Sequence, residues 1–231
     1  IIFSTKSLQN NKKFIDLRPL IKLDSMKATM KTLSAILICC FISTIQMYGE
    51  NIQRPESENY VKGVEALNEG NPEAAYTYLN AEINEHPDNG YAHCYMALIC
   101  NFCNDTKLAL KALNSSLELI PEADTEYRSF AHYSRGVLLT NLKMWEHAEA
   151  DLNEAIRLNP EDVENYKSRA QLYFETERYE ESLDDLTRAL KLDSKADVND
   201  LVLQLMAVAP TSEFMERITA TYQQLDQVTI H

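Results

Sequence analysis

The sequence predicts an all-α fold, a solenoid of helical hairpins, and a 34-residue period is the main reason. Small residues recur at this spacing, together with leucines and a closing proline. The matched pairs are Gly63/Ala97, Ala75/Ala109, Leu79/Leu113 and Pro87/Pro121, and the ladder resumes at Gly136/Ala170, Ala148/Ser182, Leu152/Leu186 and Ala155/Ala189. Small residues allow two helices to pack closely, and an apolar residue follows four positions later. This pattern is typical of a helical hairpin that buries its apolar face by stacking on neighbouring hairpins.

Four units of this length fit the chain, at 56–89, 90–123, 129–162 and 163–196. Their positions 8, 20, 24, 27 and 32 resemble the tetratricopeptide repeat, a family whose repeat carries small residues at positions 8, 20 and 27 and proline at 32. The resemblance covers residues 56–196 and implies a right-handed superhelical solenoid of four helical hairpins. Glu82 and Ser116 stand at position 27, where the family has alanine, so we expect looser packing in the first two hairpins.

Two irregularities interrupt the period. Five residues, Asp124–Arg128, separate the second unit from the third. They predict that the next helix starts a turn early, with Thr125 as its N-cap. After Ala196 the phase is lost, but residues 197–208 and 212–225 still predict two helices split at Pro210. We expect residues 197–231 to form a helical cap that closes the solenoid.

The N-terminal part of the chain is different in character. Residues 1–25 show no periodicity and are expected to be an unstructured or non-native upstream extension. In residues 26–49, Lys27 and Lys31 precede the apolar run Leu33–Ile45. This layout predicts a secretory signal peptide, and the run is shorter than the roughly 20 apolar residues that span a membrane. We therefore expect a linker at 50–55 and an exported protein, periplasmic or secreted. The alternative is an uncleaved signal that anchors the chain in a membrane.

The charge balance is acidic. The chain has 22 Lys and Arg against 35 Asp and Glu, a formal net charge of −13, and residues 1–48 contain more basic than acidic side chains. The predicted repeats are therefore more acidic than the chain as a whole. Such a surface repels phosphate backbones, which disfavours nucleic acid as a partner and favours a neutral or basic protein.

The family resemblance also implies where a partner would bind. In this family the first helix of each hairpin lines a concave groove, mainly through positions 2, 5, 6, 9, 12 and 13. Aromatic rings offer a large contact area at low entropic cost, and amides pair with an extended backbone. The alternative is that several of these rings pack between repeats. The candidate partner-binding residues are Tyr60, Tyr91, Tyr95, Asn101, Phe102, Phe130, Tyr133, Asn141 and Phe174.

Charged pairs inside the third and fourth units have a structural explanation. Arg135 and Asp151 occupy positions 7 and 23 of one unit, and Arg169 and Asp185 occupy the same positions of the next. The second unit has apolar residues at both places. Because charge at one position accompanies charge at the other, we expect an ion pair between the two helices of each hairpin. The alternative is a catalytic Arg–Asp pair.

No sequence motif indicates a catalytic centre. The sequence has no Gly-rich phosphate loop, HExxH motif or nucleophile elbow. Cys94, Cys100 and Cys103 fall in one predicted helix and are expected to be buried structural thiols. The alternatives are a redox role or a metal site. His93 and His132 occupy a packing position of the repeat. We therefore predict no metal and no cofactor.

These observations predict a non-catalytic scaffold that binds a peptide or helix of a partner protein. One alternative is the adaptor portion of a larger enzyme, or of one that docks in trans. Another is a structural spacer that self-associates. The identity of the partner is not encoded in the motifs.

Overall fold

The computed structural model describes residues 52–208 and 211–228, with side chains through residue 221. The expected upstream extension and signal peptide lie outside the described residues. Ten helices and no strand are found in the described part. They are α2 (Glu58–Asn68), α3 (Pro72–Glu85), α4 (Gly90–Phe102), α5 (Thr106–Leu119), α6 (Thr125–Asn141), α7 (Trp145–Leu158), α8 (Val163–Glu175), α9 (Tyr179–Leu192), α10 (Asn199–Val208) and α11 (Ser212–Val228).

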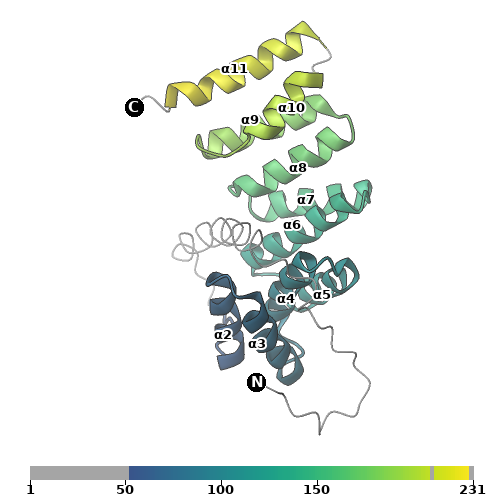
Figure 1. The fold of residues 1–231 in the computed structure, drawn as a ribbon, viewed down its shortest axis with the longest axis vertical. Coiled ribbons are helices and arrows are strands. Elements are labelled where there is room, and N and C mark those ends of the chain that lie inside the picture. The colour runs from purple at the N-terminus through teal and green to yellow at the C-terminus, as the bar shows by residue number, and fades with distance from the viewer. Residues whose placement is uncertain (1–51, 209–210, 229–231) are drawn as a thin grey trace.

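The helices stack in chain order along the long axis of the molecule (Figure 1). Each of α2, α4, α6 and α8 packs most extensively on the helix that follows it, which makes four hairpins. Successive hairpins meet through α3 and α4, α5 and α6, and α7 and α8, and the first helices α4, α6 and α8 also touch in turn. The predicted all-α solenoid of four hairpins is therefore confirmed.

Small residues set the spacing of the two helices in a hairpin. A Cβ atom added to Gly63 would lie 2.7 Å from Cγ of Leu79, and one added to Gly136 would lie 2.7 Å from Cγ of Leu152. Both leucines are fully buried. The repeat thus places a small residue on the first helix opposite a leucine on the second, as the period predicted.

Each hairpin turns through one residue in the left-handed backbone region. These residues are Gly70, Asn104, Lys143 and Glu177, with φ values of 70°, 59°, 58° and 60°. All four hold position 15 of their units. Only glycine adopts this conformation without steric cost, and asparagine tolerates it better than most residues. The last two hairpins therefore hold a strained residue at the turn.

Several helices begin at side-chain caps. Asn71, Asn89 and Asp105 each accept a hydrogen bond from the backbone N–H three residues on. Such caps satisfy the free N–H groups of a first helical turn. α6 does start a turn early, but its cap is Asp124, whose carboxylate accepts from the N–H of Tyr127 at 3.2 Å. The prediction of Thr125 as the cap was wrong by one residue, because Thr125 already belongs to the helix.

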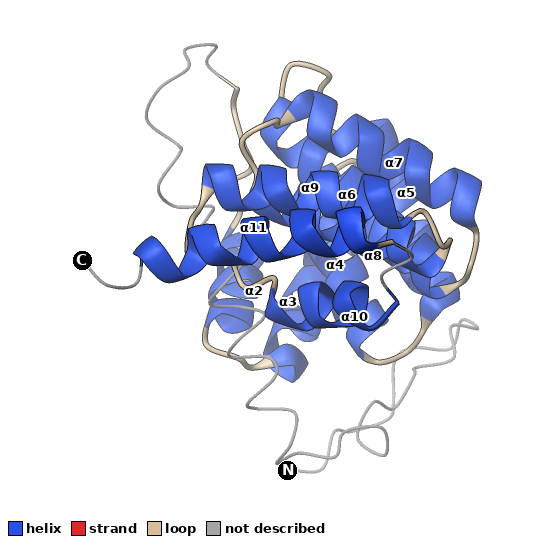
Figure 2. Cartoon of the chain, turned by 90° about the horizontal axis from the view of Figure 1, so that it is seen from above, coloured by secondary structure: helices blue, strands red, loops and turns tan. Residues whose placement is uncertain are grey.

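The C-terminal helices close the stack. α10 and α11 cover the last hairpin, and Figure 2 shows them lying over the end of the solenoid. Phe214 and Ile218 of α11 are fully buried against a cluster that includes Leu183 and Leu186 of α9. Two further clusters lie towards the N-terminus, one spanning the first three hairpins and one between the third and fourth. The apolar core is thus divided along the solenoid.

Candidate partner-binding site

Four tyrosines from three successive first helices form one cluster. The rings of Tyr60 on α2 and Tyr95 on α4 lie 6.1 Å apart. The Tyr127 ring on α6 meets Tyr91 edge to face at 4.7 Å and Tyr95 at 6.3 Å. The Tyr127 hydroxyl lies 3.2 Å from that of Tyr95 and 3.5 Å from that of Tyr60. Successive first helices thus bring side chains 32 to 67 positions apart into one cluster.

An arginine from the segment before α2 is seated on this cluster. The guanidinium of Arg54 lies 4.5 Å from the centre of the Tyr127 ring. It donates two hydrogen bonds to the carboxylate of Asp124, at 3.1 and 3.2 Å, and one to Glu126 at 2.6 Å. The hydroxyl of Tyr91 also donates to Asp124, at 2.9 Å. We call Arg54, Asp124, Glu126 and Tyr127, with Tyr91 behind them, the arginine clasp.

Electrostatics in the clasp favour the ion pairs. Partial burial works against the charge of Arg54, but its hydrogen bonds to Asp124 and Glu126 more than offset this and raise its pKa. Burial of the Tyr91 ring, together with its hydrogen bond to Asp124, raises the pKa of the phenol, so Tyr91 stays a donor. The Asp124 side chain has 0% of its surface exposed. A carboxylate so enclosed needs these partners.

The nine residues predicted from the sequence have different degrees of burial. Tyr60, Tyr91 and Phe130 belong to the core cluster, with 7%, 5% and 9% of their surface exposed. Asn101 and Asn141 are exposed. Four rings are partly buried: Tyr95, Phe102, Tyr133 and Phe174. Tyr60, Tyr91 and Tyr95 come together in the tyrosine cluster.

Phe102 shares α4 with Tyr95, and the other three rings lie further along the solenoid. Phe130 and Tyr133 stack on each other at 6.4 Å with an interplanar angle of 21°. Phe174 packs on Tyr179 at 5.7 Å, which ties it to the last hairpin. The nine residues therefore form a run along the first helices and not one pocket.

Sequence reasoning missed four residues of the clasp. Arg54 lies before the first unit, and Asp124, Glu126 and Tyr127 lie in the five-residue interruption. Positions counted within a repeat therefore could not include them. Two features of the sequence point to this region. One is the five-residue interruption of the 34-residue period. The other is the proline that follows Arg54, because a residue before proline favours an extended backbone.

The two predicted Arg–Asp pairs are confirmed. Arg135 holds Asp151 with two hydrogen bonds of 2.7 and 2.8 Å, and Arg169 holds Asp185 with two of 2.7 Å. Each arginine also donates to an asparagine on the second helix of the hairpin before, Asn114 or Asn153. The pairs therefore join neighbouring hairpins as well as the helices of one hairpin.

One histidine distinguishes the two pairs. Nδ1 of His132 lies 2.9 Å from the Asp151 carboxylate. Burial opposes ionisation of Asp151, but hydrogen bonds from Arg135 and His132 outweigh it and lower the pKa. At Asp185, which has Arg169 but no such histidine bond, burial prevails and raises the pKa.

Cys94, Cys100 and Cys103 are buried and free, as predicted. Burial raises the pKa of the Cys94 and Cys100 thiols to about 12. Thiols of this kind are weak nucleophiles at neutral pH. Within residues 52–208 and 211–221, no three His, Cys, Asp or Glu side chains gather as metal ligands would.

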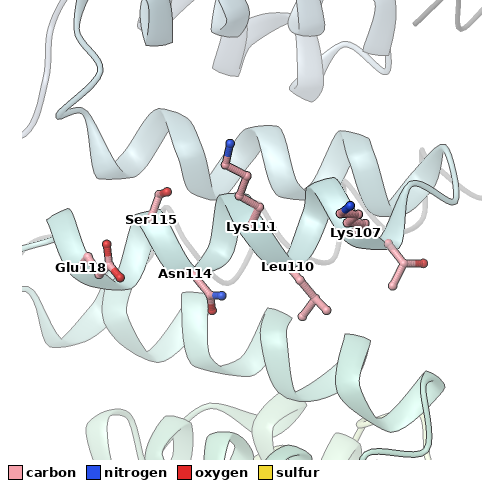
Figure 3. A pocket seen from close by; sticks show the side chains of 7 residues that line it. Lys107, Leu110, Lys111, Asn114, Ser115 and Glu118 are labelled. Carbon is pink, nitrogen blue, oxygen red and sulfur yellow. The ribbon is translucent and has the colours of Figure 1, made fainter.

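A shallow, open depression lies on the second helix of the second hairpin. Its lining side chains all come from α5 and include Lys107, Leu110, Lys111, Asn114 and Glu118. Figure 3 shows Lys111 pointing to one side of the helix and Leu110 and Asn114 to the other. Residues from a single helix with mixed charge do not converge on one point, so we assign no ligand here.

Among the described helices, none combines the length and the apolar character needed to cross a bilayer.

Comparison with known proteins supports the repeat interpretation. The model of the tetratricopeptide repeat family matches residues 131–162 and 164–195. Tetratricopeptide repeat protein 6 of Homo sapiens is 24% identical over 143 residues, which are 62% of this chain and 26% of that protein. A lipoprotein NlpI homolog of Haemophilus influenzae is 31% identical over 87 residues, 38% of this chain and 28% of that protein. The chain thus spans about a quarter of the length of these relatives.

Solved structures share the fold. MamA from Desulfovibrio magneticus superposes with a TM-score of 0.59 at 19% identity, over 73% of this chain and 94% of that one. YrrB, described as a TPR protein with an unusual peptide-binding site, superposes with a TM-score of 0.54 at 20% identity, over 64% of this chain and 73% of that one. The chain therefore contains two tetratricopeptide repeats that the family model matches, within a helical solenoid of the same fold as these structures.

Proposed function

We propose that this protein is a non-catalytic scaffold that binds an extended or helical segment of a partner protein along the first helices of its hairpins. The observation that carries this proposal is the run of aromatic side chains across successive first helices. Partly buried rings at Tyr95, Tyr133 and Phe174 lie on the first helices, two of which also carry the exposed amides of Asn101 and Asn141. Large rings with amides beside them are typical of protein-binding surfaces.

The fold and charge are consistent with this role. Stacked hairpins give extended surfaces that suit long peptides. The net charge of −13 favours a neutral or basic partner over nucleic acid and speeds association with a basic one. YrrB, which shares the fold, is described as having a peptide-binding site.

A double substitution tests the proposal. Tyr95→Ala with Tyr133→Ala should abolish capture of the partner from the native source while the far-ultraviolet circular dichroism stays unchanged. Lys107→Ala with Lys111→Ala on α5 is the matched control, because it removes side chains from a different helix and should leave capture intact. Equal capture by both double variants would contradict the proposal, and so would loss of the helical signal in the first variant alone.

We also propose that the protein acts in a bacterial envelope after export. The support is the basic-then-apolar layout of residues 26–49 and the similarity to the lipoprotein NlpI homolog. N-terminal sequencing of the protein from its native host should find Glu50 as the first residue. A mature chain that retains residues 26–49 would contradict cleavage.

A further inference from the structure

Four residues of the arginine clasp lie outside the four repeat units. Arg54 precedes the first unit, and its three partners all lie in the five-residue interruption Asp124–Arg128. The other hairpins stack on one another without an equivalent insertion. The clasp is therefore an addition to the solenoid, placed at the first turn of α6 where its side chains reach the tyrosine cluster.

The geometry is that of a site selective for a guanidinium group. Two edges of the planar group face carboxylates, Asp124 by a two-point contact and Glu126 by one bond, while its face lies on the Tyr127 ring. Tyr91 holds the Asp124 carboxylate in place from behind. An arginine satisfies all three contacts at once, whereas a lysine ammonium offers neither the fork nor the flat face.

The group that fills the site comes from the segment that precedes the first helix of the described residues. Residues 52–57 form no regular structure, and Pro55 favours an extended backbone at Arg54. The Arg54 side chain keeps 27% of its surface exposed, against 0% for Asp124. Asp124 is thus enclosed and held by Tyr91, while Arg54 and Glu126, whose side chain is 25% exposed, form the outer part of the clasp.

We propose that the arginine clasp recognises an arginine side chain on an extended segment of the partner protein, and that Arg54 occupies the site until the partner displaces it. This inference deepens the proposed function and rests on it. Charge complementarity favours such a partner, because the chain carries 35 acidic against 22 basic side chains. An internal occupant is tethered at high effective concentration, so it weakens binding of a competing arginine without abolishing it.

Titration with a synthetic peptide tests the proposal on the full chain. The probe is acetyl-Ile-Gln-Arg-Pro-Glu-Ser-amide, the sequence of residues 52–57. Its control carries citrulline in place of arginine, which keeps the shape and removes the charge. Arg54→Ala should bind the arginine peptide at least about tenfold more tightly than the wild type, because the tethered competitor is gone. It should not bind the citrulline peptide measurably.

Two further measurements keep the test decisive. Arg54→Ala with Glu126→Gln should lose most of the affinity for the arginine peptide. In the wild type, an excess of the arginine peptide should move the Nε–H resonance of Arg54 to the position of a solvated arginine. That second readout does not require the variant to fold. Equal binding of the two peptides, or an Arg54 resonance that never moves at saturation, would overturn the proposal.

The test separates this inference from the function on which it rests. If capture of a partner depends on Tyr95 and Tyr133 but is unchanged by Glu126→Gln, the clasp is only an internal tether and the scaffold proposal stands. If capture depends on none of these residues, the scaffold proposal fails as well.

Discussion

Asp151 and Asp185 occupy the same repeat position, but the side chains around them give the two carboxylates different pKa values. Both carboxylates are held by an arginine through two hydrogen bonds, and both keep 6% of their residue surface exposed. Only Asp151 also faces a histidine nitrogen, at 2.9 Å. The pKa is lowered at Asp151 and raised at Asp185. The balance between burial and pairing therefore differs within one repeated motif.

This difference predicts how stability depends on pH. A lowered pKa means that ionised Asp151 stabilises the folded state above the unfolded pKa of about 4, and that this contribution is lost as the pH falls through the lower folded value. Asp151→Asn should cost about 3 kcal/mol of unfolding free energy at pH 7, because it breaks a largely buried pair. The cost should shrink in acid below about pH 4. Urea denaturation at pH 7 and pH 3 measures it.

Asp185→Asn is the matched control. Its raised pKa means that burial already disfavours the charge, so the loss at pH 7 should be smaller than for Asp151→Asn. A change within about 0.5 kcal/mol for Asp151→Asn at pH 7 would show that the pair does not matter for stability.

At the same scale, the sequence could identify pairs within a repeat but not the burial of single rings. Arg135 and Asp151 were recognisable because position 7 and position 23 carry charge together. Tyr91 and Tyr95 look alike in sequence, yet Tyr91 is enclosed by the Tyr127 ring and the Asp124 carboxylate. Those neighbours lie more than 30 residues away, in the segment that breaks the period, so counting positions could not find them.

At the scale of the element, the hairpin turns predict a simple way to stabilise the protein. Glu177 turns the last hairpin at φ 60°, where a side chain is strained. Glu177→Gly should raise the unfolding free energy by about 0.5–1 kcal/mol, the strain relieved less the entropy that glycine adds to the unfolded chain. Thermal denaturation followed by circular dichroism measures the change.

Asn104→Gly gives the comparison, because asparagine already tolerates φ 59°. Its gain should be smaller than that of Glu177→Gly. A loss of stability in Glu177→Gly would mean that the strain is negligible and the entropy of glycine dominates.

The sequence predicted the positions of the hairpins more accurately than the residue that caps α6. Proline and small residues at fixed spacing predicted the hairpins, and the break at Asp124–Arg128 predicted an early start for α6. The choice between Asp124 and Thr125 as the cap was not decided by residue type, since both are good caps. Asp124 caps the helix because its carboxylate also binds Arg54 and Tyr91.

At the scale of the whole molecule, the divided core predicts local unfolding. Each hairpin packs only on its neighbours, so a loss at one end need not propagate to the other. Ile218 of α11 is fully buried in the C-terminal cluster. Ile218→Ala should cost about 2–5 kcal/mol locally. Hydrogen exchange should speed up in α8–α11 and stay unchanged in α2–α5.

Exchange that rose equally throughout the chain would show one cooperative unit instead. Leu203→Ala is the control, since that side chain is 57% exposed on α10 and its removal leaves no cavity.

The architecture as a whole was predictable because a 34-residue period leaves few other folds. The clasp was not predictable, because it joins Arg54 to residues 70 and 72 positions away, Asp124 and Glu126. A period describes how equivalent residues meet in successive hairpins. A contact made once, between a leading segment and an insertion, has no equivalent in any other unit.

Site-specific photocrosslinking tests the central claim, that a partner binds along the first helices, most directly. A photoreactive residue at Asn101 on α4 or Asn141 on α6 would sample the proposed surface, and one at Lys111 on α5 would serve as control. All three positions are exposed. In the native host, we predict that both asparagine positions crosslink to the same protein and that Lys111 does not. Crosslinking to that protein from Lys111 but from neither asparagine would contradict the claim.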